Sequence, residues 1–166
     1  VVVPIDRMLR AEELATMFQR AGINIVLFSR HYAETILQIM PECQDLLLPV
    51  CFDEYADDQV YNYKDVCHIN SDVHAYAQRP INPDDVGILL FTSGTTSKSK
   101  IVMLSQRNIC SDIMNMYKMC ELNPSDSFLS VLPLHHTYEC TCGFLAQIYK
   151  GTTIYIGEGL TKITTD

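Results

Sequence analysis

Two hydrophobic patterns alternate along the first third of the chain. Continuous apolar runs are typical of buried strands, whereas apolar residues that recur every three or four positions indicate helices. The pattern predicts, in order, a strand end at residues 1–3, a helix at 11–21, a buried strand at 23–28, a helix at 32–40 and a strand at 46–52. Gly22 and Pro41 supply the expected ends of the two helices. Pro49 favours an edge position or a bend in the third strand.

The same alternation continues in the second half of the chain. It predicts strands at 86–91, 101–104, 128–132 and 152–156, a helix from Ser105 to about Glu121, and a helix from about 140 to 150. Ser105 is a good N-cap, and Gly151 is expected to end the last helix. The first of these helices should bury a stripe formed by Ile109, Ile113, Met116, Tyr117 and Cys120. The second should turn Phe144, Leu145 and Ile148 inward.

The order of these elements predicts the fold class. Strands that alternate with helices require crossover connections, so we expect an α/β fold with a mainly parallel sheet flanked by helices. Its 166 residues are enough for one subdomain, which we expect to span 1–166. The first residue is Val, and residues 164–166 complete no obvious element. We therefore expect the chain to be part of a larger catalytic domain in a longer protein.

Charge and cysteine content narrow the function classes. The net charge is −8, and the 92 residues up to Thr92 hold 14 acidic and 6 basic side chains. An acidic chain without a basic stripe is a poor candidate for binding nucleic acid. No apolar run approaches the 20 or so residues of a membrane span, and no signal-peptide pattern is present. The seven cysteines are scattered without C-x-x-C spacing, which favours buried free thiols and a cytoplasmic location.

The segment from Thr92 to Lys100 is the first candidate site. It follows the strand at 86–91 and reads Thr92, Ser93, Gly94, Thr95, Thr96, Ser97, Lys98, Ser99 and Lys100. Small residues leave backbone N–H groups open to a ligand, hydroxyls add donors, and the lysines add positive charge. These are the groups with which a loop binds a polyphosphate.

A Walker-type phosphate loop is a competing interpretation of this segment. That motif requires G-x-x-x-x-G-K-[ST]. Counting from Gly94 places Ser99 where the second glycine belongs and Ile101 where the magnesium-binding hydroxyl belongs. The Walker interpretation therefore fails at two of its four fixed positions.

His135 and His136 form the second candidate site. They follow the strand at 128–132 and precede a helix, and such turns line the ligand crevice of doubly wound folds. Adjacent residues of an extended segment point to opposite sides, so we expect only one imidazole to face the crevice. Metal binding is the less favoured role, because the pair lacks carboxylate or cysteine partners at a ligand spacing.

Both sites resemble motifs of the adenylate-forming enzymes, which include acyl-CoA synthetases, firefly-type luciferases and amino-acid-activating domains. Their phosphate loop reads T-S-G-T-T-G-x-P-K-G-V, and the sequence from Thr92 is similar to it, with Ser97, Ser99 and Ile101 as departures. Their L-P-x-x-H motif is matched from Leu132 to His136. The resemblance extends over almost the whole chain and implies the first part of the N-terminal domain.

The resemblance also implies an activity. An ATP-dependent acid–CoA ligase would activate a carboxylic acid as its acyl-adenylate and transfer the acyl group to CoA. The resemblance implies that Thr92 to Lys100 would hold the β- and γ-phosphates, that Thr95 would contact Mg²⁺, and that His136 would lie beside the adenylate. Glu139 resembles the acidic residue of the long-chain fatty acid–CoA ligase branch. ATP, CoA and a carboxylic acid are the partners expected, and the oligomeric state stays open.

Two alternatives share these motifs. One is an amino-acid adenylation domain of a peptide synthetase, which would use a carrier protein in place of CoA. The other is a non-catalytic homologue that uses the fold as an interaction module. The segments that bind adenine and ribose in this family lie downstream of residue 166, so the chain alone is expected to be inactive.

Overall fold

A computed structural model describes residues 1–68, 76–92, 100–157 and 159. Contacts divide the chain into two compact units, one of residues 7–80 and one that combines residues 1–6 with 81–166. The expectation of a single subdomain over 1–166 stays a prediction. Among the described residues, no helix is long and apolar enough to cross a membrane.

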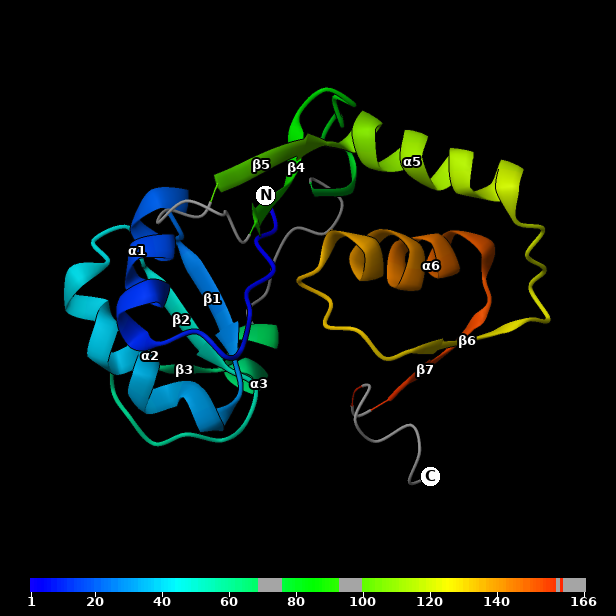
Figure 1. The fold of residues 1–166 in the computed structure, drawn as a ribbon. Coiled ribbons are helices and arrows are strands. Elements are labelled where there is room, and N and C mark those ends of the chain that lie inside the picture. The colour runs from blue at the N-terminus through cyan, green and yellow to red at the C-terminus, as the bar shows by residue number, and fades with distance from the viewer. Residues whose placement is uncertain (69–75, 93–99, 158, 160–166) are drawn as a thin grey trace. The chain divides into compact units, whose positions relative to one another are not determined.

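The unit of residues 7–80 is a small parallel sheet with helices (Figure 1). Its elements are α1 (Ala11–Ala21), β1 (Ile25–Phe28), α2 (Ala33–Ile39), β2 (Leu48–Cys51), β3 (Tyr61–Asn62) and α3 (Tyr63–Cys67), with 3-10 turns at Arg30–Tyr32 and Met40–Glu42. The strand order is β1-β2-β3, and both pairings are parallel. Gly22 ends α1 in the left-handed conformation, at φ 60°, as its position predicts.

Two expectations for this sheet are corrected. In β1 only Phe28 is buried, whereas Ile25 and Leu27, which are two residues apart and so share one face of the sheet, are more than half exposed. Pro49 lies in the central strand rather than at an edge. It is tolerated there because β3 pairs only with Val50 and Cys51, so its missing N–H falls before that pairing begins.

The second unit begins with an antiparallel hairpin, β4 (Val86–Thr92) and β5 (Lys100–Ser105). Seven residues connect the two strands, too few for the crossover that a parallel pair requires. Val2 forms an isolated parallel bridge with Ile88 on the other edge of β4. The hairpin leads into α5 (Gln106–Met119), which runs beside α6 (Ala146–Lys150) in Figure 1.

A βαβ unit completes this part of the chain. Strands β6 (Ser127–Ser130) and β7 (Thr153–Ile156) pair in parallel, and the chain between them forms a π-helix, Glu139–Leu145, that continues into α6. Gly151 ends α6 at φ 76°. Among the described residues two of the three sheets are parallel, with α2 between β1 and β2 and with the π-helix and α6 between β6 and β7, which confirms the α/β fold class.

The core of this unit joins the hairpin to the π-helix. Ile88 and Leu90 of β4 are buried against Cys140, and Leu104, Ile109 and Leu145 pack around them. On α5 the predicted stripe is correct for four of its five members, but Cys120 is exposed because the helix ends at Met119. Cys67 and Cys110 are exposed as well, so the expectation that the free thiols are buried is wrong for these three.

The π-helix shifts the faces of the helix that follows it. A π-turn closes over one more residue than an α-turn, so every later side chain is rotated from the position that a regular helix predicts. Gln147 therefore points inward and is 2% exposed, whereas Ile148, expected inside, is exposed. The amide of Gln147 donates to the carbonyl of Cys142 at 2.9 Å and accepts from the hydroxyl of Thr152 at 2.7 Å.

Candidate functional site

The two ends of the predicted phosphate loop lie side by side. Thr92 closes β4, Lys100 opens β5, and the two residues are direct partners in the antiparallel pairing. Both side chains are exposed. The residues between them, Ser93, Gly94, Thr95, Thr96, Ser97, Lys98 and Ser99, lie outside the described part of the chain, so their placement stays a prediction. A Walker loop leads into a helix, whereas this segment leads into strand β5, which is further evidence against the Walker interpretation.

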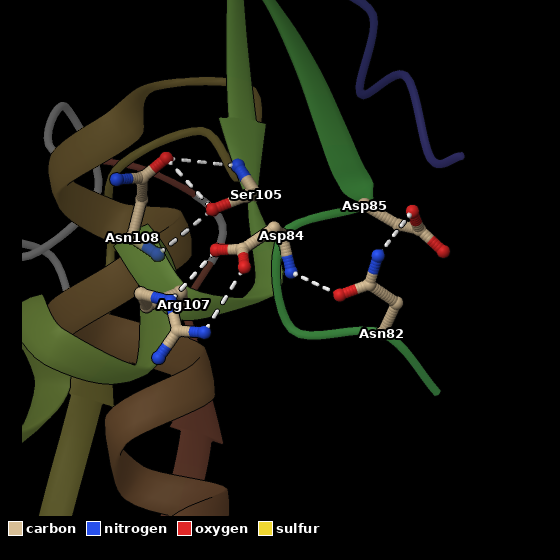
Figure 2. A network of polar contacts seen from close by, with 6 residues as sticks. All are labelled: Asn82, Asp84, Asp85, Ser105, Arg107 and Asn108. Carbon is tan, nitrogen blue, oxygen red and sulfur yellow. Dashed lines mark hydrogen bonds and ion pairs between the residues drawn. The ribbon is translucent and has the colours of Figure 1, made fainter. Parts of the chain in front are cut away.

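A polar network holds the opposite end of the hairpin (Figure 2). The guanidinium of Arg107 binds both carboxylate oxygens of Asp84, with Nε–Oδ1 at 2.7 Å and Nη2–Oδ2 at 3.1 Å. The backbone N–H groups of Gln106 and Arg107 donate to the carbonyls of Asp85 and Pro83. The first turn of α5 is thereby attached to the segment that enters β4.

Local sequence explains most of this network. Ser105 caps α5 by accepting from the backbone N–H of Asn108, whose side chain accepts from the backbone N–H of Ser105. Asn82 forms a turn by accepting from the N–H of Asp84 and donating to the carboxylate of Asp85.

The two-point contact between Asp84 and Arg107, called the fork below, was not predicted from the sequence, because the β4–β5 hairpin was not predicted. An antiparallel pair with Val86 opposite Ser105 places these two residues across from each other.

The fork shifts the pKa of both partners. The hydrogen bonds from Arg107 lower the pKa of the Asp84 carboxyl, and those same bonds raise the pKa of Arg107. Both side chains are more than half exposed, so water and salt screen most of the attraction. The network therefore defines geometry at the base of the hairpin and adds little to the stability of the fold.

The histidine segment forms a tight turn between β6 and the π-helix. The N–H of His136 donates to the carbonyl of Pro133 at 3.0 Å, and the carbonyl of His136 accepts from the N–H of Cys140 at 2.9 Å. The two imidazoles lie together, with ring centroids 4.4 Å apart. The expectation that they point to opposite sides is wrong, because it assumed an extended segment and the backbone turns here.

The two histidines nevertheless differ in environment. The His135 side chain is 17% exposed, and its Nε2 lies 3.6 Å from Oδ2 of Asp6. Burial lowers the pKa of His135, the carboxylate of Asp6 opposes that shift, and the neighbouring His136 adds to it. His136 is exposed. The residue that was predicted to lie beside the adenylate is thus the accessible member of the pair.

A buried polar pair closes the histidine segment. The hydroxyl of Ser130, at the end of β6, donates to Oε1 of Glu139, at the start of the π-helix. The two residues are 3% and 2% exposed. Sequence reasoning singled out Glu139 only by its resemblance to one branch of a family. Its burial could have been suspected from its place one residue before Cys140, in the first turn of a helix with an apolar face.

The sequence matches a known family and several known proteins. The family model of the AMP-binding enzyme matches residues 1–165. A probable CoA ligase, CCL9, of Humulus lupulus is 38% identical over 84 residues, which are 51% of this chain and 16% of that protein. A crotonobetaine/carnitine–CoA ligase of Escherichia coli (strain K12 / DH10B) is 29% identical over 162 residues, or 95% of this chain and 31% of that protein.

Solved structures show the same fold. The anthranilate CoA ligase AuaEII, in complex with anthranoyl-AMP, matches with a TM-score of 0.86 and 15% identity, over 99% of this chain and 32% of that one. ATP-bound MatB from Rhodopseudomonas palustris matches with a TM-score of 0.75 and 23% identity, over 95% of this chain and 30% of that one. The chain thus spans about a third of these proteins or less. Because the family model extends over all but the last residue, the chain belongs to the AMP-binding enzyme family.

Proposed function

We propose that the full-length protein that carries this chain is an AMP-forming acid–CoA ligase. The observation that supports this most directly is the family match over residues 1–165, which includes both candidate sites. The pairing of Thr92 with Lys100 adds to it, because a hairpin brings both ends of a hydroxyl-rich segment to one place. Hydroxyls, free backbone N–H groups and lysine side chains are the donors that a polyphosphate requires.

The reaction has two steps. A carboxylate oxygen of the acid attacks the α-phosphorus of ATP, and the bond to the bridging oxygen breaks to release pyrophosphate. The sulfur of CoA then attacks the carbonyl carbon of the acyl-adenylate, and AMP leaves. The protein contributes mainly position and charge neutralisation, as in other phosphoryl and nucleotidyl transfers.

Roles for individual residues follow from this proposal. Thr92 to Lys100 would hold the β- and γ-phosphates, and Thr95 would contact the magnesium ion that accompanies ATP. The ion neutralises phosphate charge when it is bound. His136 lies beside the acyl group and the adenylate, a role that fits an exposed imidazole next to a helix start.

A fatty acid is the proposed substrate. The L-P-x-x-H match from Leu132 to His136, with Glu139 three residues further on, is similar to the long-chain branch of the family. Free cysteines support a cytoplasmic location, because a reducing compartment keeps thiols unpaired.

The decisive experiment is ATP–pyrophosphate exchange by the purified full-length protein over a panel of acids. The panel contains fatty acids of graded length, aromatic acids and amino acids. We expect exchange with fatty acids and, when CoA is added, formation of the thioester. Exchange with amino acids alone would favour a peptide-synthetase domain, and no exchange with any acid would favour a non-catalytic homologue.

The isolated chain should behave differently from the full-length protein. Since residues 1–166 span only about a third of related ligases, we expect no exchange by this chain alone. Measurable exchange by purified residues 1–166 would contradict that expectation and would place the whole ATP site within them.

A further inference from the structure

The loop that carries both histidines is closed by one buried side-chain contact. Ser130 and Glu139 stand at the two ends of residues 131–138, and the Ser130 hydroxyl donates to the Glu139 carboxylate. Both residues are at least 97% buried. A buried hydrogen bond to a carboxylate is strong, and its loss leaves a polar group without a partner.

The backbone of the π-helix leaves a space for this carboxylate. Gly143 lies one turn after Glu139, and a Cβ added to it would stand 2.5 Å from the carboxyl carbon of Glu139. No side chain fits there unless the carboxylate moves. The Glu139 head group is therefore confined between the hydroxyl of Ser130 and the backbone of Gly143.

This confinement extends to His136 through the first turn of the helix. The carbonyl of His136 accepts from the N–H of Cys140, the residue directly after Glu139. The N–H of His136 is bound in turn to Pro133. His136 is thus attached on both sides to a short loop whose two ends are joined by the pair of Ser130 and Glu139.

We propose that Glu139 is a positioning residue that, through its bond to Ser130 and its seat on Gly143, holds His136 beside the acyl-adenylate. The proposal rests on the function proposed above for His136. Glu139 itself is 2% exposed, so in this proposal it acts through the loop and not by contact with the reacting atoms. Its effect is on where the imidazole lies when the adenylate forms.

Kinetics of the full-length protein provide the first test. Glu139→Ala and Ser130→Ala should each lower kcat for adenylation by about tenfold with a smaller change in KM for ATP, since the phosphate loop is untouched. Glu139→Gln keeps an oxygen that can accept from Ser130 and should retain most of the activity. Gly143→Ala should act like Glu139→Ala, because its new methyl group displaces the carboxylate. Ile148→Ala, on the exposed face of α6, is the matched control.

A double-mutant cycle separates positioning from mere folding. If Glu139 acts through His136, then Glu139→Ala should lower kcat little further in a His136→Ala background. Equal losses in the two backgrounds, or full activity of both Glu139→Ala and Gly143→Ala, would overturn the proposal.

A second measurement does not depend on activity. Imidazole resonances followed by NMR titration report the pKa of His135, which burial and the neighbouring His136 lower from 6.5 against the opposing effect of Asp6. Opening of the loop in Glu139→Ala or Gly143→Ala should expose His135 and raise this pKa towards 6.5, whereas Glu139→Gln should leave it low. An unchanged pKa in the first two variants would contradict loop closure. If the unaltered protein activates no acid, the proposed function fails, while this titration still decides whether Glu139 positions the histidines.

Discussion

The β4–β5 hairpin and the histidine loop are held by different kinds of contact. The hairpin is fixed by backbone pairing from Thr92 to Val86 and by exposed polar groups at its base. The histidine loop has no strand pairing of its own, and a buried hydrogen bond between Ser130 and Glu139 joins its ends. Backbone pairing is insensitive to most side chains, whereas a buried pair depends on two particular ones.

This difference predicts where substitutions act. In the hairpin, changes within the loop should alter ligand binding and leave the fold intact, because the strands pair without those side chains. In the histidine loop, changes in buried groups should alter both stability and the position of the imidazoles. The following predictions apply to the full-length protein, from the largest expected effect to the smallest.

Removal of the proposed phosphate ligands should cause the largest loss. Lys100→Ala and Thr95→Val should each lower adenylation by roughly tenfold or more, since each removes a charge-assisted contact of about 1.5 to 3 kcal/mol. The melting temperature should stay unchanged in Lys100→Ala, because the Lys100 side chain is exposed, and in Thr95→Val, because the two side chains are nearly the same size. Exchange assays at subsaturating ATP measure the effect, and full activity in both variants would disprove a polyphosphate site here.

The two histidines should give opposite results. His136→Ala should slow adenylation by about tenfold without a change in melting temperature, because its side chain is exposed. His135→Ala should mainly lower stability, since its ring is largely buried against Asp6. Paired kinetic and thermal measurements on the two variants test this. The reverse pattern would assign the catalytic role to His135, and zinc bound by both would replace the proposed role altogether.

Acid should weaken the histidine loop more than the hairpin. The pKa of His135 is below 6.5 in the fold, so in the window between the two values the unfolded chain binds more protons. Its contribution to stability is therefore complete above pH 6.5 and is lost as the pH falls towards the folded value. Denaturant unfolding at several pH values should show this slope, and His135→Gln should remove it. A slope that persists in His135→Gln would belong to another group.

The smallest effect is expected at the base of the hairpin. Asp84→Asn breaks an exposed fork, so it should lower the melting temperature by no more than a few degrees and less at high salt. Arg107→Lys keeps the charge but loses the two-point contact, and it should behave similarly. A loss of adenylation as large as that of Lys100→Ala would mean that the fork controls the far end of the hairpin.

The fold was predictable where local patterns and tertiary structure agree. The helix from Ala11 to Gly22, the capped helix from Ser105 and the strands near Phe28 and Phe128 were all found at or close to the predicted positions. Pairing was harder, because it depends on distant residues. Periodicity did not reveal that β5 returns antiparallel to β4, or that β1 lies at an edge with Ile25 and Leu27 exposed.

The candidate site was predictable by type but not by geometry. The order of residues from Thr92 to Lys100 pointed to a polyphosphate, and the pairing of these two ends is compatible with that. The histidines were identified from the sequence, but the prediction of an extended segment missed the turn at Pro133. Their close packing depends on that turn. The contact of Ser130 with Glu139 joins two elements nine residues apart, and a period of two or of 3.6 carries no information about such a contact.

The π-helix makes the packing of α6 depend on the number of residues between Glu139 and Leu145. Each residue of an α-helix turns the following side chains by about 100°. Deletion of one residue between Glu139 and Leu145 would restore a regular helix and bring Ile148 to the inward position that Gln147 now occupies. The loss of a single codon in this segment would therefore exchange a polar core contact for an apolar one.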